Sequence, residues 1–159
     1  MKKYKSVCLI AFFPFLLPGN KVTIVTFPEL QAYAASKHND TLYVVNFWAT
    51  WCEPCVKELP AFQQEYKKYA SKKVKMIFVS LNAPREINTV QKFVDSKNLN
   101  ILVLLLNGGN PNNWIDKIDS SWSGAIPATV MYKLGKKVYF REGEFTSETL
   151  EKAIQSKIK

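Results

Sequence analysis

Cysteine and histidine are scarce in this sequence, which has three cysteines and one histidine among 159 residues. Three cysteines are too few for a miniprotein held together by disulfides. Zinc usually needs four ligands, but only Cys52 and Cys55 lie close together, and the one histidine, His38, is distant in the sequence. A metal-binding module that uses this CxxC pair is therefore the weaker alternative. We expect His38 to be a solvated residue in a polar turn.

The sequence also lacks a hydrophobic run near its start that is long enough to cross a membrane. Residues 7–17 carry no charge, and as a helix they would span about 17 Å, against roughly 30 Å of bilayer hydrocarbon. Lys2, Lys3 and Lys5 precede this run, as in a signal peptide. We therefore predict a signal peptide or N-terminal targeting segment at residues 1–20 and one domain at residues 21–159.

The leader has two consequences for the mature chain. It predicts export to the periplasm or cell envelope, with membrane association through the N-terminus as an alternative. No cleavage site of the small-x-small type follows the run, so the sequence does not decide whether the leader is removed. Cys8 lies within the leader, and any disulfide within the mature chain must then join Cys52 to Cys55.

Segments typical of nucleic-acid-binding proteins are missing too. The net charge is +9, but the lysines are scattered. The sequence has no arginine-rich helix and no alternation of aromatic and basic residues. We interpret them as a solvated basic surface and predict no nucleic-acid partner. With 47% hydrophobic and 22% charged residues, the composition is that of an ordinary globular domain. No repeat, low-complexity tract or linker divides the chain.

The spacing of apolar residues predicts alternating strands and helices. Strands are expected at residues 22–25, 42–48, 74–80, 101–106, 128–133 and 137–141. Helices are expected from about residue 26, from the cysteines to about residue 71 with a kink at Pro60, after Pro84, at about 114–118, and after Thr146. This order predicts an α/β fold with helices on both faces of a sheet that is parallel at first and ends in an antiparallel hairpin.

The segment NFWATWCEPCVKELP, residues 46–60, carries the reactive groups. A strand that leads directly into a helix places Cys52 at the helix N-terminus, where free amides and the helix dipole stabilise a thiolate. Cys52 is therefore the predicted nucleophile, and the more sheltered Cys55, one turn further on, can resolve a mixed disulfide. Glu58 can carry a proton to or from Cys55, or it can be a solvated helix residue. Asn46 offers no titratable group.

The tryptophans differ in their expected roles. Trp48 ends an apolar strand, so we expect it in the core. Trp51 lies beside the nucleophile and is expected to form an apolar lip of the site. For Trp114 and Trp122 the sequence leaves both core packing and a partner surface open.

Two segments carry a resemblance to a known family. FWATWCEPC at residues 47–55, followed by ELP at 58–60, resembles the active-site segment of thioredoxin-fold thiol-disulfide oxidoreductases, in particular their exported bacterial TlpA/ResA-like branch. GAIPAT at residues 124–129 is similar to that family's cis-proline loop. The resemblance implies a thioredoxin-like fold with a β-α type insertion before the cis-proline strand, and a cis bond between Ile126 and Pro127. It also implies catalytic residues Cys52, Cys55 and Glu58, and substrate-binding residues Trp51, Pro54, Ile126 and Pro127.

The same resemblance implies a function. We expect an extracytoplasmic enzyme, acting as a monomer without a cofactor, that reduces protein disulfides in cytochrome c maturation or a similar process. Its partners would be disulfide-containing proteins and an upstream thiol reductant. The Glu-Pro pair between the cysteines favours a reductant without fixing the potential. A thioredoxin-fold peroxidase is the other alternative, but it would have threonine three residues before the reactive cysteine, where this chain has Ala49.

Overall fold

The structure is a computed structural model that describes residues 20–34 and 40–158. The predicted leader, apart from Asn20, lies outside the described residues, and so does His38. Within the part of the chain that the structure describes, no helix has both the length and the apolarity needed to cross a bilayer.

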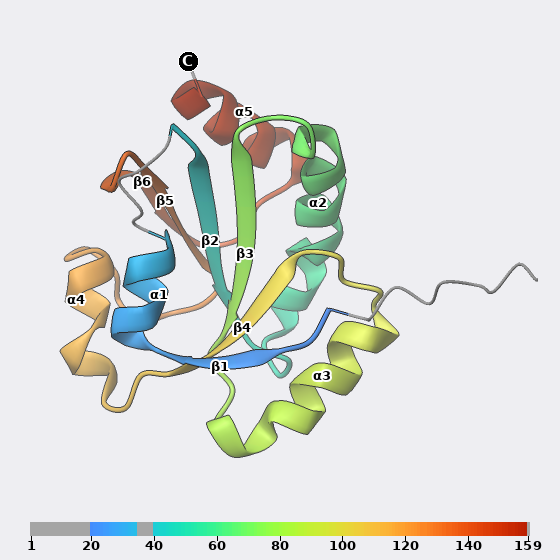
Figure 1. Cartoon of the computed structure of the whole chain (residues 1–159), viewed down its shortest axis with the longest axis vertical. Helices are drawn as coiled ribbons and strands as arrows, with labels where there is room; N and C mark the ends of the chain where they lie inside the picture. Colours follow the sequence, from blue (N-terminus) through green and yellow to red (C-terminus); the bar gives the residue numbers. More distant parts are fainter. Residues whose placement is uncertain (1–19, 35–39, 159) are drawn as a thin grey trace, which may run out of the picture.

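A six-stranded mixed sheet forms the centre of the molecule (Figure 1). Its order is β1-β4-β3-β2-β5-β6, in which β1, β4, β3 and β2 are parallel and the β5–β6 hairpin is antiparallel. The strands are β1 (Thr23–Thr26), β2 (Leu42–Trp48), β3 (Val74–Ser80), β4 (Leu102–Asn107), β5 (Ala128–Lys133) and β6 (Lys136–Glu142). The predicted fold class is confirmed.

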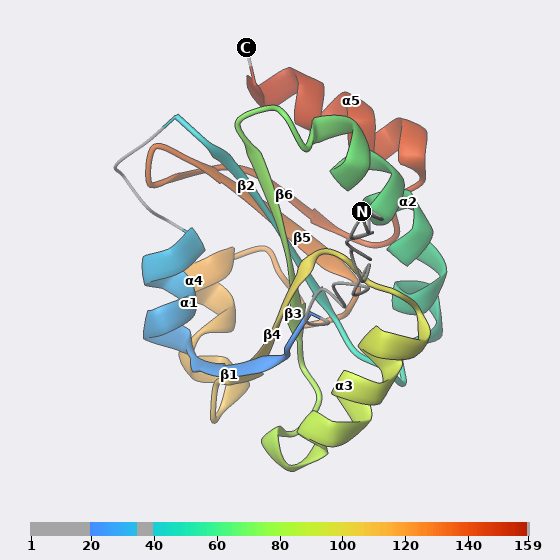
Figure 2. The same cartoon turned by 45° about the vertical axis from the view of Figure 1, so that its right-hand side comes forward.

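Helices cover both faces of this sheet, as Figures 1 and 2 show. The helices are α1 (Phe27–Ala34), α2 (Glu53–Tyr69), α3 (Ile87–Ser96), α4 (Ile115–Ile118) and α5 (Ser147–Ile158). Residues of α2, α3 and α5 share one buried apolar cluster, and residues of α1 and α4 share the other. Each face of the sheet therefore has its own core.

Strand β2 lies at the centre because its sequence, LYVVNFW, can be buried on both sides. All seven residues are buried, and the strand pairs with β3 on one side and β5 on the other. A nearly continuous apolar run is what a strand covered on both faces requires. The carboxyl end of this central strand is where the two cysteines follow.

The structure corrects several predicted boundaries. The helix expected after Pro84 is divided into a 3₁₀ turn, η1 (Pro84–Glu86), and α3, because the Glu86 and Ile87 amides bond to the carbonyls three residues earlier, those of Ala83 and Pro84. Helix α2 ends at Tyr69, two residues before the predicted end at about residue 71. It continues on both sides of Pro60. A second 3₁₀ turn, η2 (Pro111–Asn113), precedes α4.

Candidate active site

The two cysteines lie where β2 leads into α2. Cys52 is the N-cap residue of α2 with an extended backbone (φ −90°, ψ 101°), as the sequence predicts. Its Sγ accepts a 3.3 Å hydrogen bond from the Cys55 amide, one of the free donors at the helix N-terminus. Cys52 and Cys55 are joined by a disulfide, so the structure is that of the oxidised form. Cys52 is 6% exposed and Cys55 is fully buried, so only Cys52 can be reached from outside.

The loop before β5 lies opposite Cys52. The Ile126–Pro127 bond is cis, as the family resemblance implies. Antiparallel pairing of Phe47 with Ala128 holds this loop next to the end of β2. The Ile126 carbonyl oxygen lies 3.7 Å from Cys52 Sγ. Two segments more than 70 residues apart in sequence thus meet at the sulfur.

Glu58, one helical turn after Cys55 on α2, is buried, with 2% of its surface exposed. Its carboxylate accepts a 2.7 Å hydrogen bond from the Asn46 side chain and another of 2.7 Å from the Phe145 amide. Burial raises the pKa of Glu58 to about 7, against the opposing effect of these two hydrogen bonds. The alternative of a solvated helix glutamate is therefore wrong, and the carboxyl is poised to change its charge near neutral pH.

Asn46 is a residue of this site whose part the sequence analysis missed. Its side-chain amide donates to both Glu58 Oε1 and Thr129 Oγ1, at 2.7 and 3.1 Å. Its own oxygen, Oδ1, has no hydrogen-bond partner among the described residues. The available signal was that Asn46 is the one polar side chain between Val44 and Trp48 in a fully buried strand. A buried amide in such a place usually has a specific partner.

Asn82 is a second residue that the sequence analysis missed. It is buried at the end of β3, and its Oδ1 accepts hydrogen bonds from the Thr50 amide (3.0 Å) and the Ser80 hydroxyl (2.9 Å). Its Nδ2 donates to Thr50 Oγ1 at 2.9 Å. This side chain therefore ties the turn before Cys52 to the neighbouring strand.

The other predicted residues lie around the sulfur at different depths. Trp51 is 66% exposed beside Cys52, and Pro54 and Ile126 are half-buried. Trp48 is fully buried and packs on Phe78 and Phe93, as predicted for a core residue. Trp114 and Trp122, left open by the sequence, pack in the core against Phe47.

A metal site finds no support at the cysteines. In the described ranges, no group of three or more histidine, cysteine, aspartate or glutamate side chains is close enough together to hold a metal ion. Cys52 and Cys55 thus have no further ligand of these kinds among the described residues.

The chain is similar to known thiol-disulfide oxidoreductases. It is 34% identical over 114 residues to thiol-disulfide oxidoreductase ResA of Bacillus thuringiensis subsp. konkukian, which covers 70% of this chain and 60% of that protein. The chain therefore spans about 60% of the length of this curated relative.

Solved structures have the same fold. StoA from Bacillus subtilis matches with a TM-score of 0.57 at 26% identity, covering 72% of this chain and 83% of that one. A thioredoxin-related protein from Neisseria meningitidis serogroup B matches with a TM-score of 0.64 at 26% identity, covering 74% and 85%. The sequence model of the AhpC/TSA family matches residues 18–140, well over half of the chain. This protein is therefore a member of the AhpC/TSA family with a thioredoxin-like fold.

Proposed function

We propose that the protein is a thiol-disulfide oxidoreductase that reduces protein disulfides through Cys52 and Cys55. The observation that carries this proposal is the placement of Cys52 at the N-terminus of α2, against the Ile126 carbonyl, with a buried Cys55 behind it. A sulfur in this position has a stabilised thiolate and one accessible side. The similarity to ResA supports the same activity.

The exchange proceeds in two steps from the reduced form. The Cys52 thiolate attacks one sulfur of the substrate disulfide, a new bond joins Cys52 to that sulfur, and the other substrate sulfur leaves as a thiolate. Cys55 then loses its proton and attacks Cys52 Sγ, which forms the Cys52–Cys55 bond of this structure and releases the second substrate sulfur. Two electrons pass to the substrate, and an upstream thiol reductant restores the dithiol.

Glu58 serves in this scheme as the group that receives the proton of Cys55. It lies one helical turn beyond Cys55 on α2, and both side chains are buried. A pKa of about 7 suits a residue that must accept and return a proton at neutral pH. Trp51, Pro54, Ile126 and Pro127 would contact the substrate around Cys52.

The proposal includes a place of action. The charged start and uncharged run of residues 1–20 support export to the periplasm or cell envelope. The substrates there would be oxidised proteins, with the cysteines of cytochrome c precursors as one candidate class. The lysines behind the net charge of +9 are scattered over the chain, and we propose no partner for them.

Cysteine variants test the proposal. Purified protein is assayed for reduction of the insulin disulfides with dithiothreitol as electron source. Cys52→Ser is expected to lose turnover, because Cys55, the other cysteine among the described residues, is fully buried. In a separate reaction of reduced Cys55→Ser with insulin and no dithiothreitol, a mixed disulfide with the substrate is expected to accumulate, visible as a mass increase that later addition of dithiothreitol removes. Turnover by Cys52→Ser at the wild-type rate would exclude the proposed role.

A further inference from the structure

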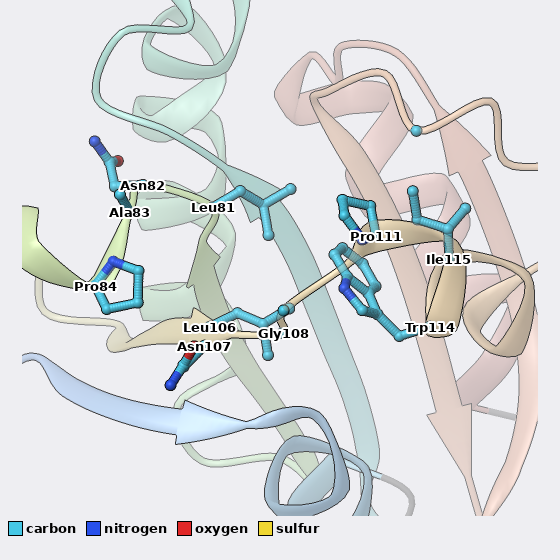
Figure 3. A pocket seen from close by; sticks show the side chains of 12 residues that line it. Leu81, Asn82, Ala83, Pro84, Leu106, Asn107, Gly108, Pro111, Trp114 and Ile115 are labelled. Atoms are coloured by element: carbon cyan, nitrogen blue, oxygen red, sulfur yellow. The ribbon is translucent and has the colours of Figure 1, made fainter.

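A cavity of about 300 Å³ opens at the carboxyl ends of β3 and β4. Figure 3 shows Leu81 on one side of it and Pro111, Trp114 and Ile115 on the other. Crevices outside the carboxyl ends of parallel strands are the usual ligand sites of open α/β sheets.

The lining of the cavity is uncharged. It consists of apolar side chains, the amides of Asn82 and Asn107, and three glycines, and it includes no lysine, arginine, aspartate or glutamate. A charged group placed here would lose its hydration without gaining a partner of opposite charge. An apolar side chain would instead exchange water for contacts with Leu81, Trp114 and Ile115.

Glycines at two walls of the cavity leave room for its apolar side chains. A Cβ atom on Gly108 would lie 2.6 Å from Trp114 Nε1, and one on Gly124 would lie 3.1 Å from Ile115 Cδ1. The indole N–H of Trp114 is buried against Gly108 and has no acceptor among the described residues.

The cavity shares its walls with both loops that frame Cys52. Asn82 lines it and also binds Thr50, two residues before the nucleophile. Gly124 lines it and lies two residues before Ile126, whose carbonyl faces Cys52 Sγ. The cavity therefore adjoins two segments that lie next to Cys52.

We propose that this cavity binds an apolar side chain of the polypeptide whose disulfide is reduced at Cys52. The inference rests on the proposed function and adds a substrate preference to it. The Asn82–Thr50 bond of 3.0 Å and the two residues from Thr50 to Cys52 put the cavity wall within about 10 Å of the nucleophile. An extended chain covers that distance in about three residues, at about 3.3 Å each. The apolar residue should thus lie about two to four positions from the substrate cysteine.

Peptides of matched length test the preference. Each has one central cysteine capped as a disulfide with 2-mercaptoethanol, in a serine and glycine background. A single leucine or a single aspartate is placed two, three or four positions before or after the cysteine. For the wild-type protein, kcat/KM is expected to be about tenfold higher with leucine than with aspartate on one side of the cysteine, because burial of leucine is favourable.

Two cavity variants and one control connect the preference to this cavity. Leu81→Lys places an ammonium group in the cavity. Pro111→Lys places one there from the opposite wall. Because Pro111 is exposed, this second substitution should disturb folding less. Both are expected to abolish or reverse the preference for leucine over aspartate. Leu134→Lys makes the same charge change on the exposed β5–β6 turn and should keep the wild-type preference.

The peptide assays distinguish a failure of side-chain binding in the cavity from a failure of disulfide reduction at Cys52. Equal kcat/KM for leucine and aspartate peptides in the wild-type protein would overturn the inference and leave disulfide exchange in place. An unchanged preference in both cavity variants would also overturn it, since the preference would then come from another surface. Failure of the wild-type protein to reduce bis(2-hydroxyethyl) disulfide or any peptide would instead reject the proposed function.

Discussion

The carboxyl group of Glu58 shows most clearly how a single residue is changed by its surroundings. It is enclosed between β2, α2 and the segment before α5, with hydrogen bonds from Asn46 and Phe145 that only partly offset the cost of burial. Burial thus raises the pKa of Glu58 from its ordinary value of 4.5 to about 7 in the folded chain. Between these values the unfolded state binds fewer protons than the folded state, so stability falls as pH rises and then levels off.

This difference gives a prediction for Glu58→Gln. The uncharged amide removes the cost of ionising a buried carboxyl, which is at most about 3 kcal/mol in the free energy of unfolding. The amide NH₂ cannot accept the bond from Asn46 or from Phe145, which lowers stability at every pH. The stability of the variant relative to the wild type is therefore expected to rise by about 1–3 kcal/mol between pH 4.5 and pH 8. Urea unfolding of the oxidised proteins at both pH values measures this. Asp116→Asn, an exposed isosteric change, serves as control. A Glu58→Gln curve parallel to wild type would contradict the raised pKa.

At the scale of elements, the N-terminus of α2 is fixed by its neighbours as well as by its own sequence. Asn82 at the end of β3 binds the turn before Cys52 through the amide and hydroxyl of Thr50. Further along α2, Glu65 accepts a 2.8 Å hydrogen bond from the Ser147 hydroxyl at the start of α5. Glu58 accepts a 2.7 Å hydrogen bond from the Phe145 amide, just before α5. Two carboxylates two turns apart on α2 therefore hold α5 and the segment before it against α2.

The contact between Asn82 and Thr50 gives the second prediction. Asn82→Ala leaves the half-buried Thr50 amide without its acceptor and should cost about 1–3 kcal/mol in unfolding free energy. Thr50→Val keeps that backbone bond and loses only the hydroxyl, so a smaller cost is expected. In the reduced proteins, Asn82→Ala should also slow alkylation of Cys52 by iodoacetamide at pH 7, because a loosened turn no longer holds Sγ over the helix N-terminus. Equal effects of the two variants on both measurements would show that the backbone bond does not matter.

The whole molecule is organised by the two cores on either face of its sheet. One contains Leu150 of α5 and the other contains Leu30 of α1, and both side chains are buried. The cores meet through one layer of strands whose hydrogen bonds run from β1 to β6. Disruption of either core should therefore destabilise the entire sheet.

Leu30→Ala and Leu150→Ala test this coupling. Each creates a cavity and is expected to lower the free energy of unfolding by about 2–5 kcal/mol. Each variant should still unfold in one transition in urea, with tryptophan fluorescence and circular dichroism changing together. Separate transitions for the two probes in either variant would show that the two faces unfold independently.

Much of the fold could be predicted because its signals are local. The bounds of β2, β3 and β5 match the predicted ranges, since apolar runs and turn residues mark them directly. Cys52 was placed correctly at a helix N-terminus for the same reason. The 3₁₀ turn at Pro84–Glu86 was missed because the hydrogen bond from Ala83 to Glu86 can also begin an ordinary α-helix. Boundaries of this kind depend on geometry that sequence patterns do not resolve.

The sequence by itself determined that two cysteines lie one turn apart at the start of a helix that follows a buried strand, because hydrophobic period and cysteine spacing are properties of neighbouring residues. Only the tertiary structure decided the burial and the raised pKa of Glu58, since its hydrogen-bond partner Phe145 lies 87 residues away in the sequence. The tertiary structure alone also brought Ile126 to Cys52, Asn82 to Thr50, and the walls of the uncharged cavity together. Burial and long-range hydrogen bonds set the pKa and shape of a site, and both arise only when distant segments pack.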